Sequence, residues 1–287
     1  MNSKSQSIVV LGTQCALIIM VILALTAINP LPAQAATPTP TSLPSKPFMV
    51  YLGFDDGPVP GATDRVLDIL KQYNVKATFF VEGAHIATAP YLLRRELQEG
   101  HHIGNMLVFH DPSVMAFGHA DTKLLVEKYN ETDAAIRAAL GPLAAQWDAE
   151  EPYKPFRWPG GAVKAFPLAN VVTYNWNTTN ADDLPNGNTV SGILYATLYG
   201  YPPAHYYGVY AWGDQAVVLL HDESRTMADV LPLILKNLLA NGVTFGTLPR
   251  PFDKLGTMPI KIGDVPACAR QVGNCSFMYH HYKLLVY

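Results

Sequence analysis

Acidic, basic and imidazole side chains recur where apolar segments of this sequence end, and together they could carry out acid–base or metal chemistry. Asp55 and Asp56 end the first such segment, and His221 ends a late one. His110 and Arg157 follow two segments between them. Carboxylates and imidazoles bind divalent cations, and histidine titrates near neutral pH. Taken singly, each residue is adequately explained as a surface carboxylate or a satisfied core histidine. Four segment ends that each contribute one predict a common site.

The adjacent pair of carboxylates requires a turn if both are to serve one site. Neighbouring residues on a regular strand point to opposite faces of the sheet. Gly57 and Pro58 directly follow Asp56, and this dipeptide is typical of a turn. We therefore expect the strand to end at Asp55 and the chain to reverse just beyond it.

The segments that carry these residues alternate between strand-like and helix-like patterns. Strands are expected at residues 48–54, 77–81, 156–158, 171–176, 217–220 and 243–248. Helices are expected at residues 62–73, 91–98, 123–140 and 227–240. Such alternation predicts an α/β fold with a parallel sheet, either open or closed into a barrel. In both architectures, functional groups gather at the carboxyl ends of the strands.

Five blocks in order resemble the polysaccharide deacetylases that share the NodB homology domain (carbohydrate esterase family 4). They are residues 53–58, 76–81, 100–110, 156–161 and 217–222. The first is similar to the family's T-F-D-D-G-P, with Gly53 where threonine is usual, and the last is similar to L-L-H-D. The resemblance runs from Pro47 to Pro249 and implies a distorted (β/α) barrel that forms one catalytic domain over residues 47–249.

The resemblance also implies roles for individual residues. Asp55 would be the general base, Asp56 and two histidines would bind a divalent metal that is usually zinc, and His221 would protonate the leaving amine. Arg157 would keep Asp55 ionised and oriented, as a guanidinium favours the charged form of a neighbouring carboxyl.

Four further residues are assigned to the substrate by the same resemblance. Leu219 would shape the acetyl pocket. Trp158, Pro159 and Gly160 belong to the block that is similar to R-x-P-x-G and would line the substrate site.

The third block departs from the family at a metal-ligand position. His110 matches the second metal histidine, but the first falls on Met106. Residues four apart share a face of a helical turn, so Met106 is expected to point into the site. A thioether suits Cu(I) better than zinc, which leaves Asp56 and His110 where catalytic zinc normally has three protein ligands. Recruitment of His102 is the alternative.

A further block, D-x-x-D-W in the family, has two possible registers here. If Trp176 is matched to the tryptophan that often precedes the block, Asp182 becomes the carboxylate that partners the acid histidine. If Tyr174 is matched instead, both carboxylates are replaced, by Asn177 and Asn180. We prefer the first register.

The amino-terminal residues indicate export. Lys4, a long apolar run and the triplet Ala33-Gln34-Ala35 predict a signal peptide over residues 1–35, although an uncleaved membrane anchor is the alternative. Residues 36–46 form a Pro/Thr-rich linker. Cleavage would take the net charge from −3 to −4 and leave no stable membrane span. A negative charge argues against a nucleic-acid partner, and a secreted or cell-envelope location is expected.

The remaining cysteines lie in the carboxyl-terminal extension, residues 250–287. In an exported chain, Cys268 and Cys275 are expected to form a disulfide, with a metal pair completed by His280 or His281 as the alternative.

An aromatic-rich stretch precedes the last block. It contains Tyr199, Tyr201, Tyr206, Tyr207, Tyr210 and Trp212. These rings could stack on sugar faces as a glycan platform, or they could pack a loop over the barrel.

Two functions follow from these observations. The first is a secreted, metal-dependent hydrolase that removes N-acetyl groups from N-acetylglucosamine in polysaccharides or oligosaccharides of the chitin or peptidoglycan type. The second is a catalytically impaired relative that acts as a glycan-binding or cell-wall-associated protein. Asp55, Arg157 and His221 favour the enzyme, whereas Met106 favours the impaired protein.

Overall fold

The computed structural model describes residues 48–109, 121–161, 166–180, 189–201, 206–212 and 215–248. Several predicted features lie outside these residues: the signal segment 1–35, the linker 36–46, the extension 250–287, His110, Asp182, Cys268 and Cys275. In the part of the chain that is described, no helix combines the length and hydropathy needed to cross a bilayer.

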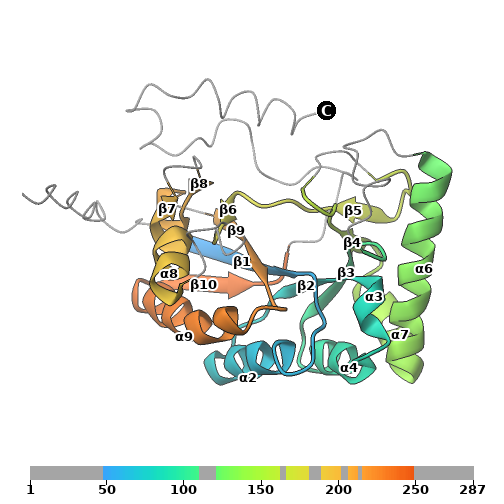
Figure 1. The fold of residues 1–287 in the computed structure, drawn as a ribbon, viewed down its shortest axis with the longest axis horizontal. Coiled ribbons are helices and arrows are strands. Elements are labelled where there is room, and N and C mark those ends of the chain that lie inside the picture. The colour runs from blue at the N-terminus through green and yellow to red at the C-terminus, as the bar shows by residue number, and fades with distance from the viewer. Residues whose placement is uncertain are drawn as a thin grey trace, which may run out of the picture. The chain divides into compact units, whose positions relative to one another are not determined.

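Eight parallel strands make up the main sheet (Figure 1). They are β1 (Phe48–Asp55), β2 (Thr78–Val81), β3 (His102–Asn105), β4 (Lys154–Phe156), β5 (Val171–Thr173), β6 (Thr178–Thr179), β9 (Gln215–His221) and β10 (Val243–Gly246). Their order is β5-β4-β3-β2-β1-β9-β6, with β10 added beside β1. The sheet forms a half-barrel, which confirms the predicted distorted α/β barrel.

The central strand β1 has three partners. Along one edge it pairs with β9 from Met49 to Asp55, so that Asp55 lies opposite His221. Its other pairings divide the strand between β10, which binds residues 48–51, and β2, which binds residues 53–55. The strand that ends at Asp55 is therefore held by pairing along its full length.

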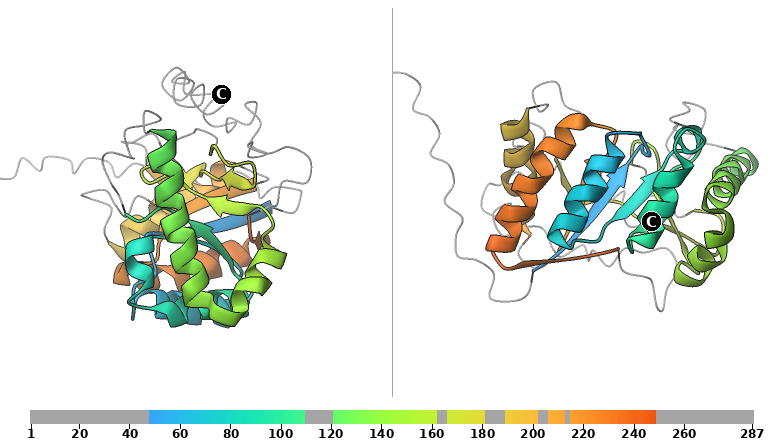
Figure 2. Two further views of the ribbon diagram at one scale, coloured as in Figure 1. Left: turned by 90° about the vertical axis from the view of Figure 1, so that its right-hand side faces the viewer. Right: turned by 90° about the horizontal axis from the view of Figure 1, so that it is seen from below.

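One layer of helices covers the outer face of the sheet. It consists of α2 (Thr63–Tyr73), α4 (Pro90–Gln98), α6 (Thr122–Leu140), α8 (Val190–Tyr199) and α9 (Arg225–Ala240). Figure 2 (right) shows α9, α2, α4 and α6 side by side in that order. Shorter helices are α3 (Gly83–Ile86), α7 (Ala144–Glu150) and the 3-10 turns at Gly141–Leu143 and Val209–Ala211. The hairpin of β7 (Gly200–Tyr201) and β8 (Tyr206–Tyr207) follows α8.

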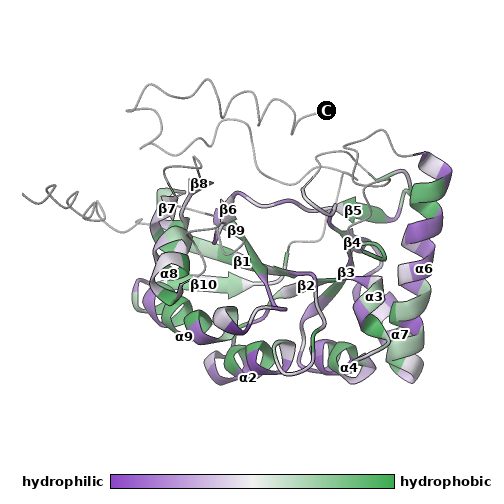
Figure 3. Cartoon of the chain, viewed as in Figure 1, coloured by the Kyte–Doolittle hydropathy of each residue, from purple (hydrophilic) through white to green (hydrophobic). Residues whose placement is uncertain are grey.

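Alternation along β1 separates the two faces of the sheet. Val50, Leu52 and Phe54 are fully buried against the helix layer, and the sheet-facing sides of the helices are correspondingly apolar (Figure 3). In α2, for example, Val66 and Leu70 lie on the buried face, as their spacing predicts. The odd-numbered residues of β1, Asp55 among them, are thereby turned to the other face.

That other face carries an apolar group of its own, which we call the inner cluster. It consists of Phe80, Met106, Val172, Tyr174, Val217 and Leu248, with Tyr51 and Trp176 packed against it. These residues come from five strands or their extensions, so the inner cluster fills the concave side of the sheet directly below the strand ends.

Most predicted elements are confirmed within one to three residues at each end. The largest differences are in the second half of the chain. The strand predicted at 171–176 ends at Thr173, while the helix α8 and the hairpin β7–β8 were not predicted. The short strands β3 and β6 and the short helices α3 and α7 were not predicted either.

Candidate active site

The carboxylates of Asp55, which ends β1, and of Asp56 face one site because the backbone reverses at Asp56. Its φ is 71°, in the left-handed region that aspartate adopts more readily than most residues. Gly57 follows with a cis peptide bond to Pro58. A Cβ at Gly57 would lie 2.2 Å from an oxygen of Asp222, so only glycine fits. The predicted turn is confirmed at this position.

Asp55 and Arg157 form a fully buried ion pair. Nη1 of Arg157 donates to Oδ1 of Asp55 at 2.6 Å, and Nε donates to the carbonyl oxygen of Tyr174 at 3.1 Å. The exposed fractions of the two residues are 1% and 0%. Burial raises the pKa of Asp55 to about 6, and Arg157 opposes that rise. Asp55 therefore has the pKa of a group that exchanges protons near neutral pH.

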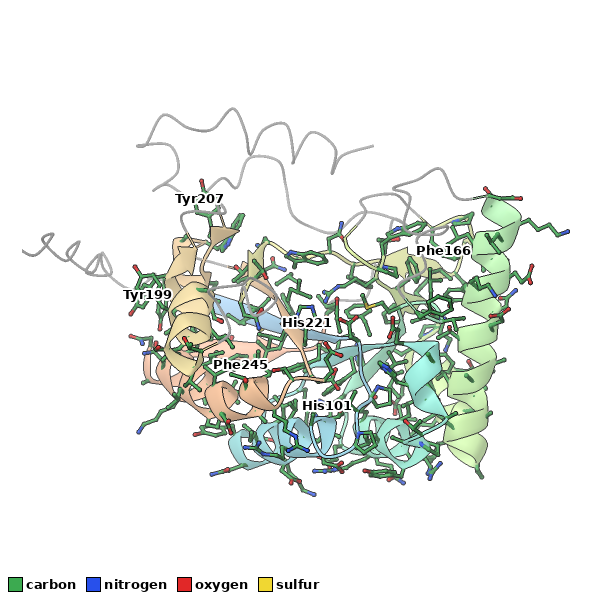
Figure 4. All side chains as sticks on the ribbon, viewed as in Figure 1. His101, Phe166, Tyr199, Tyr207, His221 and Phe245 are labelled. Carbon is green, nitrogen blue, oxygen red and sulfur yellow. The ribbon has the colours of Figure 1, made fainter. Side chains whose placement is uncertain are left out.

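His221 ends β9 beside this pair and stays partly accessible. Its Nε2 lies 3.8 Å from Oδ2 of Asp56, and Figure 4 shows His221 at the end of its strand. The structure thus brings together Asp55, Asp56, Arg157 and His221, which the sequence placed at separate strand ends. The geometry suits a reaction in which one group takes a proton and another gives one.

The rim of the site contains three polar residues that sequence reasoning missed. Nδ1 of His85 lies 2.7 Å from the carbonyl oxygen of Asp56 and 3.6 Å from a carboxylate oxygen of Glu82. Burial, followed by the charge of Asp56, raises the pKa of Glu223. Glu82 and Glu223 directly follow the ends of β2 and of the His221-Asp222 block. The rule that located Asp55 and His221 therefore also applied to them.

Two buried carboxyl groups lie beneath the rim. Asp222 accepts a hydrogen bond from Thr63 through one oxygen, and burial raises its pKa to about 7. Glu96 is fully buried in α4, and neither of its carboxyl oxygens has a hydrogen-bond partner among the described residues. Burial, and then the charge of Asp222, raises the pKa of Glu96 well above its usual range.

The expected metal ligands are only partly present in the described residues. Met106 is 3% exposed and belongs to the inner cluster, so its thioether lies among apolar side chains. His110 lies outside the described residues. Among those that are described, no three His, Cys, Asp or Glu side chains gather closely enough to hold a metal ion. The described residues thus supply Asp56 alone and do not form a three-ligand site.

Recruitment of His102 in place of Met106 is wrong. His102 is the first residue of β3, and Asn105, at the other end of this strand, is the residue nearer the site. Its Nδ1 lies 2.9 Å from a carboxylate oxygen of Glu151, which is 2% exposed. At about 3.3 Å per residue, the strand itself separates His102 from the site by roughly 10 Å.

Comparison with known proteins settles the family. The polysaccharide deacetylase profile matches residues 43–174. A chitooligosaccharide deacetylase from Sinorhizobium fredii is 33% identical over 173 residues, which are 60% of this chain and 71% of that protein. The chain belongs to the polysaccharide deacetylase family. A peptidoglycan-N-acetylglucosamine deacetylase from Listeria monocytogenes is 30% identical over 75% of this chain, but over only 40% of its own length.

Solved structures agree with this assignment. A family 4 carbohydrate esterase from Streptococcus mutans superposes with a TM-score of 0.57 and 28% identity, covering 70% of this chain and 86% of that one. A peptidoglycan deacetylase from Bacillus subtilis gives a TM-score of 0.55 with 25% identity over 71% and 89% of the two chains.

The deacetylase block with two possible registers is described up to Asn180. Oδ1 of Asn177 accepts a hydrogen bond from the backbone N–H of Val217 at 2.7 Å, so this side chain is bound to β9 well before His221. Asn177 therefore does not serve as a site residue in the register that matches Tyr174. Asn180 is fully buried where β6 ends beside Leu219. Asp182, the carboxylate of the preferred register, lies outside the described residues.

The predicted substrate residues take different positions. Leu219 lies in β9 two residues before His221 and on the same face, with 7% of its surface exposed. Trp158 is 3% exposed and packs edge-on against Phe156. Pro159 is buried and Gly160 exposed, in a turn closed by a bond from Gly161 N–H to Trp158 O.

The side chains of Tyr199, Tyr207, Tyr210 and Trp212, which the structure describes, do not lie at the deacetylase site. Tyr199, Tyr210 and Trp212 pack against the main core, and Trp212 precedes the start of β9. That strand places about 20 Å between its two ends. In Figure 4, Tyr199 and Tyr207 lie well apart from His221. The alternative in which these rings pack a loop is therefore confirmed for Tyr199, Tyr210 and Trp212.

Proposed function

We propose that this chain is a deacetylase that removes N-acetyl groups from N-acetylglucosamine units of chitin-type or peptidoglycan-type glycans. The observation that carries the proposal is the buried ion pair of Asp55 and Arg157 next to His221. The chitooligosaccharide and peptidoglycan deacetylases among the relatives support the substrate class.

The side chains divide the work of amide hydrolysis between them. Asp55 takes the proton of the attacking water, and its pKa of about 6 leaves it ionised at neutral pH. Arg157 fixes the carboxylate in place and in its charged form. His221 delivers a proton to the departing amine, which is a poor leaving group unless protonated. Leu219 would contact the acetyl methyl group.

A divalent metal, zinc by resemblance, would be held by Asp56 and His110. Polysaccharide deacetylases of this type are generally metal-dependent. A bound divalent metal supplies polarisation of the acetamide carbonyl. Because Met106 offers only a thioether in an apolar cluster, we expect the metal to be held weakly and to be lost during purification.

A glycan-binding protein with impaired catalysis is the second candidate. The observation that favours it is the burial of Met106 in the inner cluster at a metal-ligand position. For both candidates we propose a secreted or cell-envelope location, because residues 1–35 have the pattern of a signal peptide.

Acetate release distinguishes the two candidates. The purified chain is incubated with N-acetylated chitooligosaccharides or with peptidoglycan, without metal and with added zinc. The deacetylase proposal predicts acetate release that increases with zinc. Binding to the same glycans without acetate release under any divalent metal would support the glycan-binding protein instead.

A further inference from the structure

Gly53 departs from the family's usual threonine at a position that faces the reacting groups. It lies two residues before Asp55 on β1, and therefore on the same face of the strand. Its partners across the sheet are Thr78 and Leu219. The φ of Gly53 is not in the left-handed region, so backbone conformation does not require glycine here.

Space does require it. A Cβ built on Gly53 would lie 2.7 Å from Nη1, 2.7 Å from Nη2 and 3.1 Å from Cζ of Arg157. Ordinary carbon contacts are about 3.5–4.0 Å. The guanidinium plane thus lies directly against the backbone of β1, in room that any side chain at position 53 would occupy.

Three contacts hold the Arg157 side chain in this position. Its Nη1 is bound to Asp55 and its Nε to the carbonyl of Tyr174, while the ring of Phe80 lies 4.0 Å from Cζ. Nη2 is buried without a hydrogen-bond partner among the described residues, so close packing rather than a third bond fixes that edge of the guanidinium.

The ring that backs Arg157 is itself confined. A Cβ at Gly104 would lie 2.6 Å from Cδ1 of Phe80, so the ring already fills the room above β3. The stack therefore runs from Gly104 through Phe80 and Arg157 to Gly53, with a glycine at each end.

We propose that Gly53 is a positioning residue: it admits the Arg157 guanidinium against β1 and thereby sets where Asp55 is held. The family's usual threonine at position 53 would then impair this chain rather than improve it. The expected effect of Gly53 on catalysis rests on the proposed deacetylase function. Its role in the packing of Arg157 does not.

Kinetics test the effect on catalysis, with a second glycine as the control. Gly53→Ala and Gly53→Thr are compared with Gly246→Ala. Gly246 is on β10 and pairs with Tyr51 of β1, and a Cβ added to it would meet nothing closer than 3.5 Å. We expect kcat to fall about 100-fold in both Gly53 variants, the scale of a displacement of about 1 Å at a reacting group. KM should stay within about twofold, and Gly246→Ala should behave as wild type. A Gly53→Ala variant with wild-type kcat would overturn the proposal.

A double-mutant cycle tests the packing of Arg157 against Gly53 without an activity measurement. Gly53→Ala is introduced into wild type and into Arg157→Met, and urea midpoints are measured. If Gly53 serves to admit the guanidinium, Gly53→Ala lowers the midpoint in wild type and leaves it unchanged once the guanidinium is gone. An equal loss in both backgrounds refutes the proposal. Should Arg157→Met fail to fold, Arg157→Lys replaces it, since its ammonium lacks the planar fork that the Cβ would strike.

The two experiments separate the proposals. Coupling in the cycle together with an inactive wild type would leave the positioning role standing and count against the deacetylase. An active wild type with no coupling would do the reverse.

Discussion

The two sides of this site are held in different ways. The side with the proposed base, Asp55 with Arg157, is fully buried, and we call it the base side. Asp55 ends β1, Arg157 directly follows β4, and the carbonyl of Tyr174, which directly follows β5, accepts a hydrogen bond from Arg157. The metal side, Asp56 with its expected partners, arises from a turn with φ of 71° and from the segment that continues β3. The difference teaches that the pairing of the strands itself positions the base side, whereas the metal side depends on individual side chains such as Met106.

The largest expected effect is on the base side. Asp55→Asn keeps an acceptor for Arg157 but removes the charge, so we expect kcat to fall about 10²–10⁴-fold, the usual contribution of a general base. Acetate release measures it. Asp229→Asn, at an exposed ion pair with Arg65, serves as the control and should be neutral. Wild-type activity in Asp55→Asn would remove the distinction between the two sides.

The buried carboxyls beneath both sides are expected to make stability depend on pH. The pKa of Asp222 is raised to about 7 in the folded chain, so its stabilising contribution is complete below its ordinary pKa near 4 and is lost as pH rises to about 7. A difference of one pKa unit between the folded and unfolded chain changes the free energy of unfolding by about 1.4 kcal/mol. Asp222→Asn should therefore become more stable relative to wild type, by a few kcal/mol, between pH 4 and pH 8 in urea titrations.

Asp148→Asn is the matched control for that titration. Hydrogen bonding to Arg137 lowers the pKa of Asp148 to about 2, so its contribution is lost only as pH falls through the range from about 4 to 2. Between pH 4 and pH 8 its stability difference from wild type should stay constant. A constant difference for Asp222→Asn as well would show that Asp222 is ionised throughout.

The next prediction concerns a metal ligand introduced at position 106, which should make the metal side functional as well as the base side. Met106→His places an imidazole at the family's ligand position, and we expect metal content and kcat to rise at least about 10-fold, the scale on which even outer partners alter metal affinity. Elemental analysis and acetate release measure the two. Met106→Leu preserves the apolar packing and should change neither.

If Met106→His binds a full equivalent of zinc yet stays inactive, the defect lies elsewhere, with Asp182 as the first residue to examine. A full equivalent of zinc in the wild type would contradict the weak-site prediction directly.

The smallest expected effect concerns Phe109 at the rim. Its side chain is 46% exposed, and backbone bonds from Gly83 to Leu107 and from Ala84 to Val108 fix the preceding residues beside α3. An exposed ring there offers a face to a sugar, so Phe109→Ala should raise KM severalfold and leave kcat unchanged. Tyr153 is also exposed, at 38%, but it precedes the start of β4 and so lies at the opposite end of the sheet. Tyr153→Ala should therefore leave KM unchanged.

Much of the frame was predictable because its signals are local. Short contiguous segments contain the apolar runs of β1 and β9 and the helical spacing of α2 and α9. The turn at Gly57 is indicated by the dipeptide Gly57-Pro58. The helix α8 was missed because its segment, Val190–Tyr199, is rich in β-branched and aromatic residues that also suit strands.

Other features had a signal that was not used, or none. Glu96 follows Leu92 and Leu93 at helical spacing, so its burial could have been predicted from the face it occupies. The room that Gly53 leaves for Arg157 had no such signal, because it depends on two residues that are distant in sequence and on the ring of Phe80.

The pairing of β1 with the late strands β9 and β10 has a consequence for the order in which the chain folds. Residue 48 pairs with residue 243, and residue 55 with residue 221. Loop closure on this scale precedes the gain from the contacts it allows, so such pairing slows folding. During synthesis β1, which ends at Asp55, would keep one edge and half of the other unpaired until nearly the whole domain had emerged. An amino-terminal fragment that ends at residue 174, where the family profile ends, would lack β6, β9 and β10 and expose the flanks of β1. We expect such a fragment to aggregate rather than fold.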